Sequence, residues 1–202
     1  MQCPLDLDWI ALCPQQFRER FKEIVEHPPG TPEGARYFCY EDGAPMTDPP
    51  VFPDATPEER RAATLAMEEA RAANRRKFAY AWGKYAEAIT ARHILLQGLP
   101  LREWGWRPYK GVGEIDLITQ RGSRIIFVEV KARDGKNSDP WDAITPAKIR
   151  ELCRGANIYL LSQQERLEYQ FDVALITGSY DDFELEYIED AFMCPLTTTR
   201  RR

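Results

Sequence analysis

One stretch of the chain, RIIFVEVKA at residues 124–132, restricts the possible folds more than any other. Strand side chains alternate between two faces, and here both faces begin with apolar residues. Such a strand is buried on both sides, like the central strand of a sheet covered by helices. Glu129 and Lys131 follow each other on one face near its end. Charges beside a core cost several kcal/mol unless they are paired or metal-bound, so this pair indicates a functional site.

The segment just before it, residues 112–119, is predicted to be a neighbouring strand. Its alternation places Glu114 and Asp116 on one face. Gly122-Ser123 is typical of a turn. If the two strands pair as a hairpin, we expect Asp116 to lie near Glu129.

A third carboxylate comes from the helix predicted before these strands. Gly83, Glu87, Ala91 and Ile94 recur at helical spacing on one face, and Glu87 is the only charge on that stripe. Three carboxylates then point inward from three elements, and they repel one another unless a cation lies among them. Hard oxygen ligands favour Mg²⁺ or Mn²⁺ over zinc.

Ordinary explanations for these charges stay open. Glu129 and Lys131 could belong to a solvated face, and Glu114 and Asp116 could pair with nearby arginines. Glu87 could be a paired core glutamate. Lys148, at the edge of an apolar helical stripe, could extend its stem along that stripe towards water.

The first 76 residues are predicted to be a helical and irregular extension. Residues 14–26 place Phe17, Phe21, Ile24 and Val25 at helical spacing, which indicates an amphipathic helix. Eight of the fifteen prolines lie between residues 28 and 57, which favours irregular chain. The aromatic run at 36–40 fits an edge strand or a segment packed on a neighbour.

The rest of the chain predicts one layered α/β domain. A helix begins at Thr56-Pro57 and stops at residues 98–100, and its pattern allows a break near 74–78. Two or three strands, a helix over 145–161 and a strand over 171–177 follow, which is typical of a mixed sheet flanked by helices. We therefore divide the chain into residues 1–76, a core over 77–180, and an acidic then basic tail over 181–202.

Charge permits phosphate binding without requiring it. The formal net charge is −5, and residues 1–76 carry 9 basic and 14 acidic side chains. Residues 102–154 carry 11 basic and 8 acidic ones, a local excess that suits a polyanion.

Apolar runs and cysteines bear on where the protein works. No run approaches the ~20 apolar residues of a membrane span, and the first residues do not resemble a secretory signal, so we expect a cytoplasmic protein. Cys3, Cys13, His27 and Cys39 could converge on zinc. The alternative is reduced thiols, because the sequence has no CxxC pair.

These residues resemble a known family. The segments GVGEIDLI, RIIFVEVKAR, AITPAKIRELCRGANIYLL and FDVALI are similar to the YraN-like uncharacterised protein family of bacteria. GKYAEAITARHILLQG, residues 83–98, resembles that family's opening helix. The likeness covers about residues 80–177. It implies a restriction-endonuclease-like fold, similar to archaeal Holliday-junction resolvases.

The resemblance also implies roles for individual residues. Asp116 takes the place of the motif aspartate, Glu129 and Lys131 that of the E-x-K pair, and Glu87 that of the helix acid. Glu114 and Lys148 match supporting positions. The chain departs from the pattern in having alanine before Glu87, a longer stretch over 104–112, and a segment 1–76 without a counterpart.

The implied activity is a nuclease that depends on Mg²⁺ or Mn²⁺ and cuts DNA, branched forms included, to leave a 5′-phosphate and a 3′-hydroxyl. Phosphate contacts are expected from four basic residues, which could equally be solvated loop charges: Arg107, Lys110, Arg133 and Lys136. The alternative is a non-catalytic module that binds nucleic acid or a partner protein. Resolvase-like proteins suggest a homodimer, and the acidic segment 1–76 suggests a protein partner.

Overall fold

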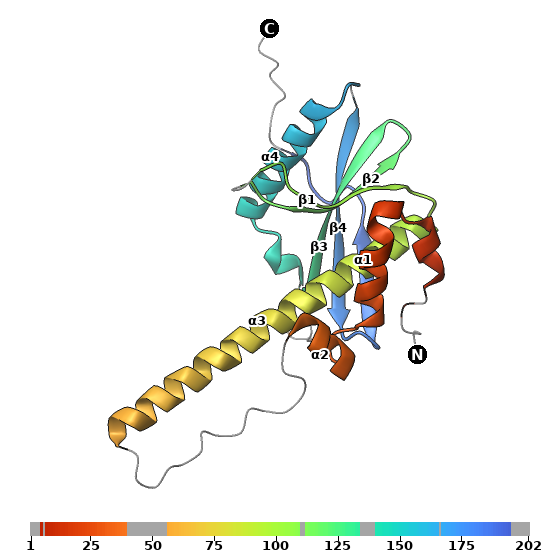
Figure 1. Ribbon diagram of the computed structural model, residues 1–202. Helices are drawn as coiled ribbons and strands as arrows, with labels where there is room; N and C mark the ends of the chain where they lie inside the picture. The colour runs from red at the N-terminus through yellow and green to blue at the C-terminus, as the bar shows by residue number, and fades with distance from the viewer. Residues whose placement is uncertain are drawn as a thin grey trace.

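A computed structural model describes residues 5, 7–39, 56–109, 112–133, 140–165 and 167–194. Five strands and the helices around them make up the described part (Figure 1). The helices are η1 (Asp8–Leu12), α1 (Gln15–Glu26), α2 (Pro32–Phe38), α3 (Pro57–Leu96), η2 (Pro140–Ala143) and α4 (Pro146–Ser162). The strands are β1 (Leu101–Trp106), β2 (Ile115–Arg121), β3 (Arg124–Arg133), β4 (Glu168–Gly178) and β5 (Phe183–Ile188).

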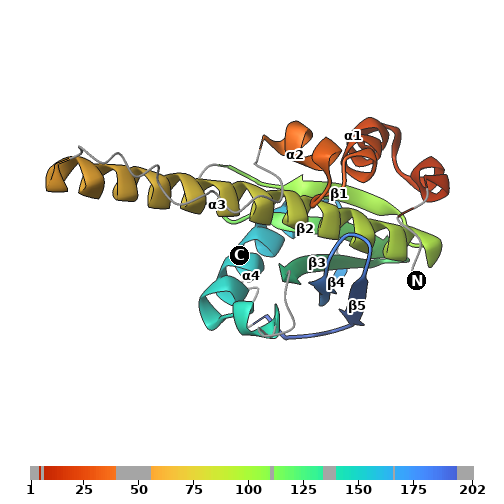
Figure 2. The same cartoon turned by 90° about the horizontal axis from the view of Figure 1, so that it is seen from below.

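The strands form one mixed sheet in the order β1-β2-β3-β4-β5. β3 and β4 run parallel, and the other neighbours are antiparallel. α3 and α4 lie on opposite sides of the sheet (Figure 2). Ile126 and Val128 of β3 join the α3 side of the core, and Ile125 and Phe127 join the α4 side. The predicted α/β sheet with helices on both faces is confirmed, and residues 124–132 form its central strand.

Helix α3 runs without interruption through residues 74–78, so the break that the pattern allowed is absent. Thr56 and Glu59 form a capping box, and Pro57 occupies the first turn. The alanine-rich sequence then contains no proline, the single glycine Gly83 is accommodated within the helix, and Gly98, with a φ of 77°, follows its end.

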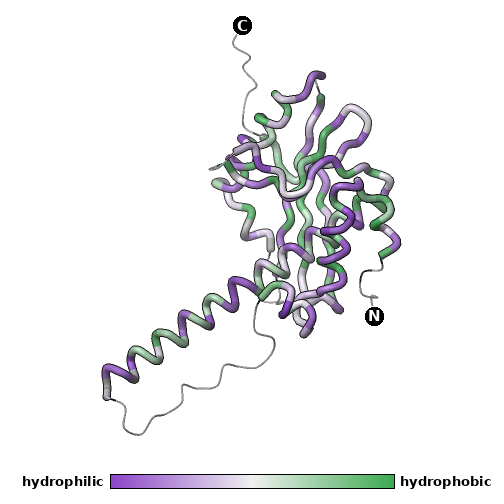
Figure 3. The backbone as a smooth tube through the Cα atoms, in the orientation of Figure 1, coloured by the Kyte–Doolittle hydropathy of each residue, from purple (hydrophilic) through white to green (hydrophobic). Residues whose placement is uncertain are grey.

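The two halves of α3 have different surroundings. Its described side chains before Ala81 are at least partly exposed, whereas the later turns lie on the sheet. The first half extends beyond the body of the molecule (Figure 1). Hydrophilic residues recur along this half, while hydrophobic ones concentrate along the central strands (Figure 3). Among the described helices, none is both long and apolar enough to cross a bilayer.

The N-terminal helices pack against this body. α1 is the predicted amphipathic helix, and it buries Phe21, Ile24 and Val25. The edge strand considered for residues 36–40 is wrong over 36–38, which belong to α2, because Thr31 caps that helix and Pro32 begins it. The alternative of packing on a neighbour is confirmed by Phe38, whose ring lies 6.4 Å from that of Tyr80 on α3.

Strand β5 extends the sheet beyond residue 180, where the sequence placed the start of the tail. Phe183, Leu185 and Tyr187 pack against the core, while Glu184 and Glu186 face outward. The alternation of a strand therefore underlies what reads as an acidic run. Residues 195–202 of the predicted tail lie outside the described residues.

Candidate active site

Pairing of β2 with β3 brings Asp116 beside Glu129. The two strands are antiparallel, with Leu117 opposite Val128. The backbone N–H of Val130 donates to Oδ2 of Asp116 at 2.8 Å. The proximity expected from a hairpin is thus confirmed.

The alternation predicted for β2 is not regular at its start. Leu117 lies on the α3 side of the core, but Ile115, which regular alternation would place on the same face, joins Ile118 on the α4 side. The paired register with β3 ends at Leu117. Residues before Leu117 are therefore free of the geometry that this ladder imposes.

Glu129 is 1% exposed and is held by two lysines. Lys131, two residues further along β3, donates to Oε1. Lys148, in the first turn of α4, approaches the same oxygen at 3.1 Å. The other oxygen, Oε2, is buried and has no hydrogen-bond partner in the described structure. Lys148 thus points at the candidate site instead of running along the helix surface to water.

Glu87 is likewise buried and paired. Lys84, one turn earlier on α3, donates to both carboxylate oxygens at 2.7 and 2.9 Å. The indole N–H of Trp104 on β1 donates to Oε2. These contacts pair Glu87 as the ordinary alternative expects, and its role at a metal ion stays a prediction.

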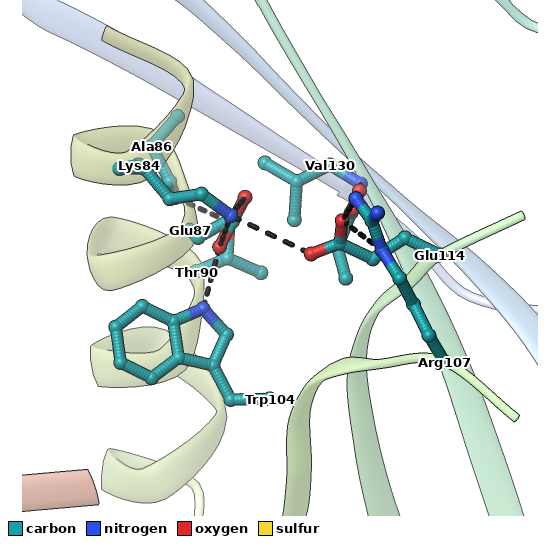
Figure 4. A network of polar contacts seen from close by, with 9 residues as sticks. Lys84, Ala86, Glu87, Thr90, Trp104, Arg107, Glu114 and Val130 are labelled. Carbon is teal, nitrogen blue, oxygen red and sulfur yellow. Dashed lines mark hydrogen bonds and ion pairs between the residues drawn. The ribbon is translucent and has the colours of Figure 1, made fainter. Parts of the chain in front are cut away.

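Lys84 also links Glu87 to the strand side of the cluster (Figure 4). Its ammonium lies 3.6 Å from Oε1 of Glu114, whose other oxygen accepts from Arg107. Sequence reasoning missed Lys84 and Trp104. A lysine three residues before the anomalous Glu87 was the available signal, whereas no local pattern identified Trp104.

The pKa values of Asp116, Glu87 and Glu114 do not all shift in the same direction. Burial raises the pKa of Asp116 well above its usual range, and the nearby Glu129 and Glu87 raise it further. Burial also raises the pKa of Glu87, although Lys84 and Trp104 oppose the shift. Burial would raise the pKa of Glu114, but Arg107 and Lys84 outweigh it and the pKa is lowered.

Burial has the opposite effect on the pKa of the lysines. Burial acts to lower the pKa of Lys84 and of Lys148, but the carboxylates around them outweigh it. Glu87 and Glu114 raise the pKa of Lys84, and Glu129 and Asp116 raise that of Lys148. Both lysines therefore stay charged, and the cluster alternates in sign.

The donor set suits a hard divalent cation at Asp116 and Glu129. Both supply carboxylate oxygens, Oε2 of Glu129 lacks a partner, and Asp116 is destabilised as an anion. In the arrangement described, however, no group of three or more His, Cys, Asp or Glu side chains converges tightly enough for an ion. Glu87 is turned to Lys84. Bringing a third acid to the ion therefore requires a change in lysine pairing.

The other predicted contacts are dispersed. The Arg107 side chain is 65% exposed, and Arg133, at the end of β3, donates to the carbonyl of Ala132 at 3.0 Å. Lys110 and Lys136 lie outside the described residues, as does Cys3 of the zinc alternative. Cys13 and Cys39 are free thiols.

Fold and cluster together define a mixed α/β protein with alternating carboxylates and lysines between α3, the β2–β3 pair and α4. Comparison with known proteins makes this specific. The model of the uncharacterised protein family UPF0102 matches residues 86–176. The chain belongs to this family, which confirms the YraN-like resemblance.

Individual relatives agree with the family match. A UPF0102 protein of Flavobacterium psychrophilum is 33% identical over 111 residues, which are 54% of this chain and 92% of the relative. UPF0102 proteins of Chlorobium chlorochromatii and Nitrosospira multiformis are each 38% identical, over 54% of this chain and over 89% and 87% of their own lengths. The matched region contains every acid and lysine of the cluster except Lys84.

Proposed function

We propose that the protein is a divalent-metal-dependent nuclease that hydrolyses phosphodiester bonds in nucleic acid, with DNA as the expected substrate. The observation that carries the proposal is the partly buried Asp116 beside the buried Glu129, with Lys131 and Lys148 on Glu129. Two acids and a lysine in this relation form the nuclease signature that the family resemblance implies.

Asp116 and Glu129, with the carbonyl of Val130, would hold Mg²⁺ or Mn²⁺. When bound, such an ion lowers the pKa of a coordinated water and polarises the phosphate. The Val130 N–H donates to Oδ2 of Asp116 and so orients the carboxylate. This hydrogen bond does not engage Oδ1, which would be the oxygen that binds the ion.

The lysines complete the chemistry. Lys131 would orient the attacking water or offset negative charge that develops on the phosphate. Lys148 is a positioning residue, because it reaches the reaction through Glu129. Glu87 would bind the ion through a water molecule or would bind a second ion. In this structure it is paired with Lys84.

A second candidate is a module that binds nucleic acid without cutting it. Its support is the pairing of Glu87 with Lys84 and of Glu129 with Lys131 and Lys148. Such pairing neutralises these carboxylates without a metal ion.

The test is a cleavage assay on single-stranded DNA, duplex, flap, four-way junction and RNA, in Mg²⁺, in Mn²⁺ and in EDTA. We expect metal-dependent cutting of at least one DNA form, lost in Glu129→Ala and in Lys131→Ala. Binding without cutting in either metal would refute the nuclease and favour the second candidate.

A further inference from the structure

An exposed aromatic ring stands beside the candidate active site. Tyr80 on α3 is 58% exposed, and the ammonium of Lys84 lies 5.8 Å from its ring centroid. Lys84 in turn contacts Glu87 and Glu114. The ring is therefore connected to the carboxylate cluster through a single side chain.

The ring also contacts an aromatic side chain of α2. Phe38 of α2 meets Tyr80 edge-on, with 6.4 Å between ring centroids and 75° between planes. Tyr37 packs on Phe38 at 4.8 Å. A braced ring loses little conformational entropy when a flat ligand stacks on it.

Basic residues accompany the ring, and two of them, Lys84 and Arg107, meet at Glu114. The side chain of Arg107 is largely exposed. Lys77 precedes Tyr80 by three residues and is exposed on α3. Residues three and seven apart share a helix face, so Lys77, Tyr80 and Lys84 line one side of α3.

We infer that Tyr80 is a stacking platform for an unpaired base of the nucleic acid, with Arg107 and Lys77 contacting phosphates beside it. An aromatic face among cations fits single-stranded nucleic acid, whose bases are free to stack. In a duplex the base faces are already covered by their neighbours. This inference rests on the proposed function and narrows its substrate to nucleic acid that is unpaired next to the scissile bond. Tyr80 precedes the region matched by the family model.

The test is binding of a fluorescently labelled single strand of about 20 nucleotides, long enough for one groove, and of the matching duplex, by anisotropy in EDTA. Tyr80→Ala should weaken binding of the single strand by about 5-fold or more and change duplex binding less than about 2-fold. Tyr80→Phe should bind like the wild type, since it keeps the ring. Tyr169→Ala, at an exposed tyrosine of β4, is the matched control and should have no effect.

Equal single-strand binding by wild type and Tyr80→Ala would overturn the inference, as would equal losses for both substrates or no binding at all. Cleavage in Mg²⁺ is measured separately on the same proteins. Cutting by a wild type whose binding is insensitive to Tyr80→Ala would leave the nuclease standing without the platform. A selective binding loss in a protein that cuts nothing would support the platform and refute the nuclease.

Discussion

Asp116 sits in an environment that disfavours its charge. Burial and two neighbouring carboxylates raise its pKa, and they outweigh the opposing effects of the Val130 N–H and of Lys131. A carboxyl whose pKa rises on folding binds its proton more tightly in the folded state. The contribution of Asp116 to stability therefore falls as the pH rises from 3.8, the pKa of the unfolded aspartate, to the higher pKa of the folded state.

Asp116→Asn should for this reason raise the melting temperature of the metal-free protein at pH 7. The amide oxygen can still accept from Val130, and each kcal/mol gained corresponds to roughly 2–4 °C in a chain of this size. The gain should shrink as the pH is lowered towards 4, where the aspartate is protonated in the wild type. Scanning calorimetry at several pH values measures it, and a lower melting temperature for the variant at pH 7 would contradict the electrostatic account.

Lys148 is predicted to act on catalysis through Glu129. Lys148→Ala removes one of the two ammonium groups on a carboxylate that is almost fully buried, and loss of such a supporting contact typically lowers activity 10- to 100-fold. The cleavage rate at saturating Mg²⁺ measures the effect. Arg150→Ala, an exposed residue of the same helix, is the control. Lys148→Arg should recover part of the rate, and an unchanged rate in Lys148→Ala would remove the residue from the site.

The sequence identified the site's acids but not how they pair. Glu87 stood out as the only charge on an apolar helix face, and Glu129 stood out with Lys131 at the end of a strand that is otherwise apolar, because burial is what periodicity reports. The choice of Lys84 as the partner of Glu87, and of both lysines for one oxygen of Glu129, depends on rotamers and on helix placement. The i, i+3 spacing of Lys84 and Glu87 allows their pairing, but a one-dimensional pattern does not select it over other partners.

At the scale of the elements, helix α1 contacts strand β1 at a residue that itself contacts the candidate site. Phe21 is fully buried, and its ring stacks on that of Trp104 with centroids 4.0 Å apart. Trp104 is also the indole donor to Glu87. The N-terminal segment thus fixes the orientation of a group that contacts the cluster.

Phe21→Ala should destabilise the protein by about 3–5 kcal/mol, the usual cost of removing a buried phenylalanine. Urea unfolding followed by tryptophan fluorescence measures the change. Leu12→Ala, at a residue that is 53% exposed in the same segment, should alter stability by about 0.5 kcal/mol or less. Similar losses in the two variants would show that α1 is not anchored through Phe21.

Elements with a clear period were predicted, and elements formed by context were not. β3 and α1 follow from their apolar patterns alone. β5 was missed because its acidic residues, Glu184 and Glu186, alternate with residues that are only partly buried. In the sequence this alternation reads as a charged tail. α2 was missed because an aromatic run favours a strand, whereas Thr31 and Pro32 start a helix there.

At the scale of the whole molecule, the region shared with the family is preceded by N-terminal helices that pack close to the candidate site. The family model covers residues 86–176, while α1, α2 and the first half of α3 lie before it. Through Phe21 and Phe38 these additions contact Trp104 and Tyr80 at the rim of the cluster. Differences in substrate between this chain and shorter relatives are therefore expected to originate in the N-terminal segment.

The central claim is that Asp116 and Glu129 accept a divalent cation, and calorimetric titration with Mn²⁺ tests it most directly. We expect the wild type to bind Mn²⁺ more tightly as the pH rises, because protons compete for Asp116. Asp116→Asn and Glu129→Gln should lose this binding, while Glu184→Gln, on the outward face of β5, should keep it. Equal Mn²⁺ binding by all four proteins, or none by the wild type, would contradict the account.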